Sequence, residues 1–325
     1  MRRSASPLSL VLLGLGVFLL VLAPMLAWYV EPRAKRTPTD INMTSVFTGK
    51  GKYFDQEDLK TKDDQKLTVT RRVLGDVAAS EKSGRAVWDV SQTIDNPTTR
   101  KLDDPRQAFQ WTTERWVTDR ETNLPVRCCK LKPANTSGEA YLKWPFDVEQ
   151  RTYNWWDSNL GATVPLRYAG REKVEGYEGL RFKGTVEPSR AGTRQVPGML
   201  VDRPESGQVQ AEEWYANSGL EFVVDERTGR ILDAATGPKV TLRAPGGEKD
   251  EVTLLQSDAL EFDKATRREA VELAKADNDK LELVGATAPL GATVLGVLLA
   301  AAGTVLLVRG VREERGGRHK REGEV

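Results

Sequence analysis

The chain has 325 residues and is nearly balanced in charge, with 48 lysines and arginines against 47 aspartates and glutamates. This balance gives no electrostatic reason to expect nucleic acid as a partner, because basic surfaces dominate such binding. The single histidine, His319, lies near the C-terminal end, which excludes Ser-His-Asp and Cys-His catalysis from the rest of the chain.

The first predicted element is an uncharged apolar run, Leu8–Val30, which follows a short N-terminal segment, residues 1–7. A helix of about 20 apolar residues crosses the hydrocarbon core of a bilayer. The run is longer than the apolar part of a signal peptide, about 7–15 residues, and no small-residue cleavage site follows it. We therefore predict an uncleaved transmembrane helix at residues 8–30. A cleaved signal peptide is the alternative, and Arg2 and Arg3 are consistent with it.

A second uncharged run, Leu283–Val308, predicts a transmembrane helix at residues 283–308, followed by a basic tail at 309–325. Basic residues on the outer flanks of both runs favour cytoplasmic termini. Arg33, Lys35 and Arg36 argue the other way. We expect a two-pass protein of the cell membrane with both termini cytoplasmic and an extracytoplasmic domain between them.

Small residues repeat every fourth position in the second run, at Ala292, Gly296, Ala300 and Thr304. Such a stripe lets another helix approach closely. The expected partner is the first run, which carries Gly14 and Gly16, or a second copy of the chain. The alternative is an Ala/Gly-rich span without packing specificity.

The segment 31–262 predicts a β-rich antiparallel domain after a linker, Glu31–Asp40, in which Pro32 and Pro38 oppose helix. Leu67–Val73 and Arg85–Ile94 alternate with period two and are predicted to pair. On the second of these strands, one face carries Ala86, Trp88, Val90, Gln92 and Ile94.

Two later stretches, Trp111–Val126 and Trp214–Leu232, share a D-x-x-T-[NG] turn between strands, at Asp119 and Asp225. The shared turn indicates two hairpins and suggests two related β halves. The alternative is that this turn chemistry is common in any β protein.

The remaining elements follow from turn and helix signals. We predict a hairpin at Lys173–Glu187 with Gly176 and Gly179 at the turn, and a mobile loop at Ser189–Gln210. Strands are predicted at Lys239–Arg243 and Glu251–Ser257. Good helix formers at Asp263–Leu281 predict a helix or stalk over residues 263–282. The fold class is α+β, a β-rich domain with a C-terminal helix between two transmembrane helices.

Six aromatic residues fall close together in the middle of the chain: Tyr141, Trp144, Phe146, Tyr153, Trp155 and Trp156. Large aromatic side chains bind sugars, acyl chains and proteins, so we single them out as a candidate ligand-binding surface. The alternative is that they fill the core of the domain.

Metal, cofactor and enzyme chemistry receive little support. The only cysteines, Cys128 and Cys129, are adjacent, and we expect two reduced thiols on opposite faces of a strand. The alternative is a vicinal disulfide, which is strained relative to normal bridge geometry. Without a nearby histidine they make a poor zinc site. No phosphate-binding glycine motif is present, and the acidic pairs Asp63–Asp64 and Asp103–Asp104 are expected to be solvated surface. We predict a protein that is not an enzyme and needs no metal or cofactor.

Four motifs carry a resemblance to a known family: ERWVTDRETNLPVRC (Glu114–Cys128), WPFDVEQRTYNWWD (Trp144–Asp157), KVEGYEGLRFKG (Lys173–Gly184) and FVVDERTG (Phe222–Gly229). With the two terminal apolar runs, they make the chain resemble the actinobacterial PorA family over nearly its whole length. The resemblance implies a protein of the actinobacterial cell envelope, and the family name implies a cell-wall porin. It brings no catalytic residues.

Two functions follow as expectations. One is that the β-rich domain binds or conducts a lipid or amphipathic envelope ligand, with both helices holding it at the membrane. The alternative is a channel-forming porin. The expected partners are membrane lipids and, through the transmembrane helices, a second copy or other envelope proteins.

Overall fold

The computed structural model describes residues 7–96, 99 and 110–321, with the side chains of residue 110 and residues 310–321 outside the description. The chain divides into two compact units, a terminal unit (1–35 and 276–325) and a β unit (36–275). The predicted acidic pair Asp103–Asp104, most of the N-terminal segment 1–7 and the tail side chains beyond Arg309, including His319, lie outside the described residues.

The terminal unit consists of helices from both ends of the chain. Its first part is α1 (Pro7–Met25), a π-helical turn (Leu26–Val30) and α2 (Glu31–Ala34). Its second part contains the end of α4 (Lys264–Glu282), another π-helical turn (Leu283–Thr287) and α5 (Ala288–Arg321). Two helical stretches, Pro7–Ala34 and Lys264–Arg309, are long and apolar enough to cross a membrane.

The predicted linker is helical where it begins, and this part of the prediction is wrong. Pro32 lies in α2, which continues directly from the preceding π-helical turn, so its ring removes one backbone hydrogen bond from this helical stretch. Each π-helical turn ends two residues before a proline, Pro32 or Pro289. The wider π-helical turn leaves room for the proline ring, where the helix lacks the hydrogen bond that the proline nitrogen cannot donate.

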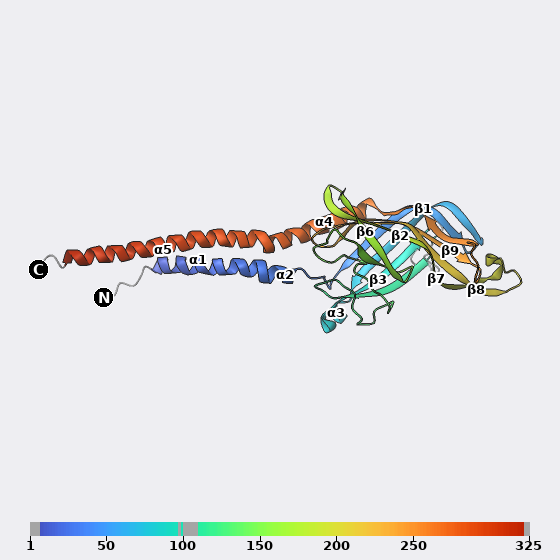
Figure 1. The fold of residues 1–325 in the computed structure, drawn as a ribbon, viewed down its shortest axis with the longest axis horizontal. Coiled ribbons are helices and arrows are strands. Elements are labelled where there is room, and N and C mark those ends of the chain that lie inside the picture. The colour runs from blue at the N-terminus through green and yellow to red at the C-terminus, as the bar shows by residue number, and fades with distance from the viewer. Residues whose placement is uncertain (1–6, 97–98, 100–109, 322–325) are drawn as a thin grey trace. The chain divides into compact units, whose positions relative to one another are not determined.

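In the terminal unit, α1 and α5 run side by side (Figure 1) and meet at small residues. A Cβ atom on Gly16 would lie 2.5 Å from the backbone nitrogen of Ala300. A Cβ atom on Gly303 would lie 2.7 Å from the backbone nitrogen of Leu13. Glycine therefore allows a separation between the two backbones that no other residue would allow.

The β unit is one antiparallel sheet. Its strands are β1 (Asn42–Asp55), β2 (Lys60–Gly75), β3 (Ala86–Asp95), β4 (Gln110–Thr118), β5 (Tyr153–Asp157), β6 (Ala162–Val174), β7 (Tyr177–Pro197), β8 (Gln208–Val224), β9 (Ile231–Arg243), β10 (Val252–Ser257) and β11 (Leu260–Phe262). Their order is β4-β3-β2-β1-β10-β9-β8-β7-β6-β5, with β11 against β1 and β9. A short helix, α3 (Val77–Ser83), joins β2 to β3. The predicted fold class is confirmed.

The sheet curls until its two edge strands meet. The Ser158 hydroxyl, just after β5, donates to the Glu114 carboxylate on β4 at 3.0 Å. The irregular segment 119–152 joins these two edges in the chain, and its Tyr141 ring packs against Trp116 of β4 and Trp155 of β5. The segment also makes isolated backbone bridges to both edges, Arg115–Lys132 on β4 and Ala140–Trp155 on β5. Side-chain contacts and these isolated bridges, rather than a continuous ladder between β4 and β5, therefore close the sheet.

Several predicted elements match the structure. Leu67–Val73 lies in β2, and Arg85–Ile94 lies in β3 apart from Arg85, which precedes the strand. The two strands pair antiparallel. The hairpin Trp214–Leu232 is formed by β8 and β9 around the Asp225 turn. The strands predicted on either side of Pro245 are β9 and β10.

Three local predictions are wrong. Ser189–Gln210 is mostly strand, because β7 and β8 continue through it as a long two-stranded ladder. Gly179 lies within β7, opposite Glu172, and the turn before it consists of Glu175 and Gly176. The hairpin at Trp111–Val126 has only one full strand, since Pro125 makes an isolated bridge to Thr118.

The first part of α4 packs on the sheet. Asp263 caps the helix by accepting a hydrogen bond from the Thr266 amide at 2.8 Å. Val271 and Ala274 are buried against Leu232 of β9. Arg267 donates to Asp233 at 2.8 Å and fixes the helix to the same strand.

Candidate functional site

A cavity of about 290 Å³ lies inside the curled sheet. Its lining comes from strands all round the sheet: Phe47 and Phe54 of β1, Val69 and Arg71 of β2, Gln92 and Ile94 of β3, Ala191 and Arg194 of β7, Glu213 and Tyr215 of β8, Thr236, Pro238 and Val240 of β9, Leu254 and Leu255 of β10, and Leu260 of β11, with Gln56, Ser158 and Asn159 from connecting segments. Because opposite parts of the sheet share one cavity, the sheet wraps around it as a barrel does.

The lining combines apolar walls with a few polar groups. Phe47, Val69 and Ile94 are each at most 7% exposed and supply apolar surface. Arg71 and Tyr215 face the same space. This mixture is typical of small-molecule sites, in which apolar contacts supply area and a few polar groups fix the orientation.

The predicted aromatic residues lie mainly beside this cavity, in the core. Trp144, Trp155 and Phe222 pack with ring centroids 4.9 Å (Trp144–Trp155) and 4.3 Å (Trp155–Phe222) apart. Tyr141, Trp144, Tyr153, Trp155 and Trp156 are all at most 4% exposed. Phe146 is half-buried, with the Lys143 ammonium 3.4 Å from its ring centroid. Most of this set therefore contributes to packing.

A second, smaller cavity of about 60 Å³ lies between the aromatic core and the larger cavity and shares lining residues with it. Tyr141, Trp155 and Trp156 line it, and Phe47, Arg71 and Tyr215 line both cavities. The structure therefore brings three of the six predicted aromatic residues to a cavity wall.

A buried polar network lies where the two cavities meet. The Tyr215 hydroxyl donates to Asp157 at 3.0 Å, and the amides of Asn159 and Leu160 donate to the other oxygen of that carboxylate. The Tyr141 hydroxyl donates to Glu114 at 2.6 Å. Burial raises the pKa of Asp157 above its usual value, and burial also raises the pKa values of Tyr141 and Tyr215. Both tyrosines therefore act as neutral donors.

Two related turns hold the aromatic segment in place. Asp119 and Asp225 each accept a hydrogen bond from the amide three residues later, at 3.0 and 2.7 Å. Asn123 and Gly229 then take positive φ angles of 58° and 69°. The Asn123 side-chain amide donates to the Lys143 carbonyl at 2.8 Å, and the Trp144 amide donates to the Gly229 carbonyl at 2.8 Å. The repeated sequence pattern thus forms two similar turns on either side of Trp144.

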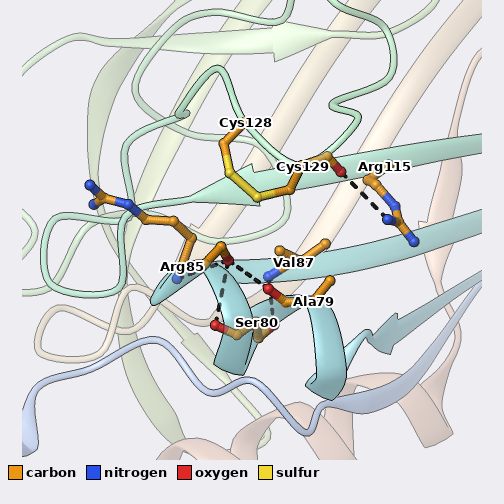
Figure 2. Close-up of a disulfide and its surroundings, with 8 residues drawn as sticks. Ala79, Ser80, Arg85, Val87, Arg115, Cys128 and Cys129 are labelled. Carbon is orange, nitrogen blue, oxygen red and sulfur yellow. Dashed lines mark hydrogen bonds between the residues drawn. A yellow bond between two sulfur atoms is a disulfide. The ribbon is translucent and has the colours of Figure 1, made fainter.

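Cys128 and Cys129 form a disulfide within the segment 119–152 (Figure 2). The expectation of two reduced thiols on a strand is wrong, because Cys129 and Lys130 have positive φ angles and form a turn instead. Arg115 of β4 lies beside this turn, with its Nη1 atom 3.5 Å from the Cys129 carbonyl oxygen.

The predicted helix-packing residues lie in the terminal unit. Gly296 and Ala300 contact Gly16 of α1, whereas a Cβ atom on Gly14 would have nothing within 4 Å. The Thr304 hydroxyl donates to the Ala300 carbonyl at 2.7 Å, within its own helix. Ala292 is half-buried. Gly303, which the predicted set omits, also contacts α1.

Arg71, a polar residue that lines both cavities, was not predicted as a site residue. Alternate residues of a strand share one face, so Arg71 belongs with the buried Leu67, Val69 and Val73. The charge of Arg71 on a strand face that is otherwise apolar was the sequence feature that could have indicated a polar group inside the sheet. Among the described residues, no group of three or more His, Cys, Asp or Glu side chains is placed to hold a metal ion.

Comparison with known proteins assigns the chain to a family. Residues 8–305 match the family described as Porin PorA. A curated protein named Porin PorA from Corynebacterium resistens is 22% identical in an alignment 226 positions long, which covers 55% of this chain and 52% of that protein. The chain thus spans about half the length of this relative. Because the family match runs from the first apolar helix through the β unit into the second, the chain belongs to the Porin PorA family and is a membrane protein.

Proposed function

We propose that the β unit binds one amphipathic envelope molecule, such as a lipid, in the cavity enclosed by its sheet. The observation that carries this proposal is the cavity of about 290 Å³, whose walls come from eight strands, β1–β3 and β7–β11. This volume is at the lower end of the range of ligand pockets, about 300–1,000 Å³, and suits one chain or part of a longer one.

The composition of the cavity favours an amphipathic molecule over a purely polar solute. Phe47, Val69, Ile94 and Leu255 provide apolar walls that an acyl chain would cover. Burial of apolar surface stabilises such a complex by about 25 cal/mol per Å² before the costs of ordering the ligand. Arg71, Gln92 and Asn159 would face the polar end of the same molecule.

Photo-crosslinking tests this proposal directly. The full chain in lipid nanodiscs would be incubated with a photoreactive, neutral medium-chain fatty alcohol, and the labelled peptides identified by mass spectrometry. We expect labels on β1–β3 and β7–β9 in addition to those that membrane partitioning places on α1 and α5. Val69→Phe should reduce labelling of the strands several-fold, because the larger ring would occupy the cavity.

Thr70→Phe is the matched control, since Thr70 lies on the opposite face of β2 and does not line the cavity. It should leave the labelling of the strands unchanged. Labels confined to α1 and α5, or equal loss with both substitutions, would refute cavity binding.

The proposal includes the placement of the β unit outside the cytoplasm, with both helices crossing the membrane. The basic residues flanking the helices support this orientation. Protease added to spheroplasts should cut the exposed turn at Met199, which is 65% exposed, and leave a C-terminal epitope tag intact. Loss of the tag with an uncut β unit would reverse the orientation.

A pore is the second candidate function, and the family description Porin PorA favours it. A pore needs a continuous water-filled path, whereas packed aromatic rings occupy much of this sheet's interior. The pore function would therefore require an assembly of several chains. Reproducible conductance steps from the purified full chain in planar bilayers would support it, and no conductance from oligomeric preparations would count against it.

A further inference from the structure

Arg71 projects from β2 into the interior of the curled sheet. Its cross-strand partner is Gln92 of β3, and the two side chains hydrogen-bond through Arg71 Nε at 3.0 Å. Arg71 is half-buried and lines both the larger and the smaller cavity. It is therefore a charged group that borders both cavities.

The guanidinium of Arg71 has hydrogen-bonding capacity left over. It carries five N–H donors, and the bond to Gln92 uses the one on Nε. Within the described part of the chain, Arg71 forms no ion pair with a carboxylate. Its other neighbours include the rings of Phe47 and Tyr141, whose centroids lie 5.8 and 5.7 Å from the guanidinium carbon.

Two carboxylates lie in the same region, but their oxygens bond to uncharged donors. Glu114 accepts from the hydroxyls of Tyr141 and Ser158. Asp157 accepts from the Tyr215 hydroxyl and from two backbone amides. Glu213, the carboxylate among the lining residues of the larger cavity, is paired with Arg194 at 2.8 Å. Among the described residues, no carboxylate therefore lies within ion-pair distance of Arg71, although its charge opposes the rise in the pKa of Asp157 that burial causes.

We infer that Arg71 is an anion-binding group of the cavity and takes the carboxylate or phosphate of an acidic amphiphile, whose chain lies along Phe47, Val69 and Ile94. This inference rests on the proposed cavity function and specifies the chemical class of its ligand. A guanidinium suits such a headgroup because it presents parallel N–H donors to two oxygens. Partial burial strengthens the interaction relative to one made in water.

The test compares two probes that differ only in the headgroup, a photoreactive medium-chain fatty acid and its fatty alcohol, on the full chain in nanodiscs. We expect the acid to label the cavity strands about tenfold more efficiently than the alcohol, as one charged hydrogen bond provides. Arg71→Gln should abolish this preference while the alcohol still labels the strands, which also shows that the variant is folded. Arg71→Lys should retain part of the preference.

Arg72→Gln is the matched control, since Arg72 is the next residue of β2, is exposed, and lies on the opposite face. It should leave the preference for the acid intact. A further labelling experiment with excess inorganic phosphate distinguishes a free anion from the headgroup of an amphiphile as the ligand of Arg71. Competition by phosphate would indicate that the site takes a free anion, and no competition would indicate that the chain is required.

Two further results would overturn the inference in distinguishable ways. If acid and alcohol label the strands equally in the unmodified protein, the cavity binds amphiphiles and the anion assignment is wrong. If neither probe labels the strands, both the anion assignment and the proposed cavity function fail.

Discussion

Trp144 lies at the centre of the aromatic core, with none of its surface exposed. Its ring packs against Trp155, Phe182 and Phe222 at centroid distances of 4.9, 5.6 and 5.4 Å. Its Nε1 atom is buried without a hydrogen-bond partner among the described residues. The large ring of Trp144 therefore stabilises the fold by packing, and the unsatisfied Nε1–H group offsets part of this stabilisation.

Substitution of Trp144 tests this balance. Trp144→Ala should lower the free energy of unfolding by about 3–5 kcal/mol, because it leaves a large cavity in the core. Trp144→Phe should cost less, since an unsatisfied N–H that costs about 1–3 kcal/mol disappears with the indole. Thermal and denaturant unfolding of the full chain in micelles would measure both values.

Trp111→Ala is the control for this pair, because Trp111 is 67% exposed on β4. It should change stability by no more than about 0.5 kcal/mol. Equal effects of Trp144→Ala and Trp111→Ala would contradict the assignment of Trp144 to the core.

Asp119 gives the protein part of its dependence on pH. The backbone amide of Thr122, the amide of Glu121 and the charge of Arg85 lower the pKa of the Asp119 carboxyl below its usual value. A carboxylate with a lowered pKa stabilises the folded state above its unfolded pKa, and this stability is lost as the pH falls through the folded pKa. The unmodified protein should therefore lose stability as the pH drops below about 4.

In Asp119→Asn, the contribution of this group to the acid-induced loss should disappear. The difference in melting temperature between neutral and acidic pH should be smaller than in the unmodified protein. An unchanged difference would mean that the turn at Asp119 does not depend on the ionised carboxylate.

Among the elements, the segment 119–152 has the role that a strand ladder would have in a closed barrel. It joins edge strands β4 and β5, places Tyr141 between them and packs Trp144 against Trp155 of β5. The turns at Asp119 and Asp225 bind its backbone from both sides. The two turns therefore fix the aromatic core as well as connecting strands.

The helix pair α1 and α5 depends on close backbone approach at Gly16. Gly16→Leu should destabilise the pair by about 1–3 kcal/mol, because the added side chain would overlap the backbone of Ala300. Gly14→Leu is the matched control, since a Cβ there meets nothing within 4 Å. Unfolding by SDS in mixed micelles, followed by circular dichroism, would compare them. An equal loss in both variants would show that α1 does not pack on α5 through Gly16.

At the scale of the whole molecule, the elements that could be predicted are those with a clear pattern within a short segment of the sequence. Period-two alternation identified β2 and β3, and the repeated Asp-to-Gly or Asp-to-Asn turn identified the segments that enclose Trp144. The Asp263 cap and the helix formers after it identified α4. In each case the local preference of the chain agrees with the fold.

Features that depend on distant contacts were not predictable. Ser189–Gln210 has the composition of a loop, yet β7 and β8 pair through it because hydrogen bonds between neighbouring strands outweigh local preference. The aromatic residues were ambiguous between core and ligand surface, since only the meeting of β4 with β5 determines which rings are enclosed. From the sequence alone, Arg71 resembles an ordinary surface charge, because only the curvature of the sheet places it at the cavity.

The central claim is that the cavity within the sheet holds an amphipathic molecule. A cryo-electron microscopy map of the full chain in nanodiscs, prepared with a saturating medium-chain fatty acid, tests it most directly. The account predicts elongated density beside Phe47, Val69 and Ile94, with its polar end at Arg71, and loss of that density in Val69→Phe. A well-resolved cavity without such density, under conditions in which the fatty acid is bound elsewhere on the protein, would contradict it.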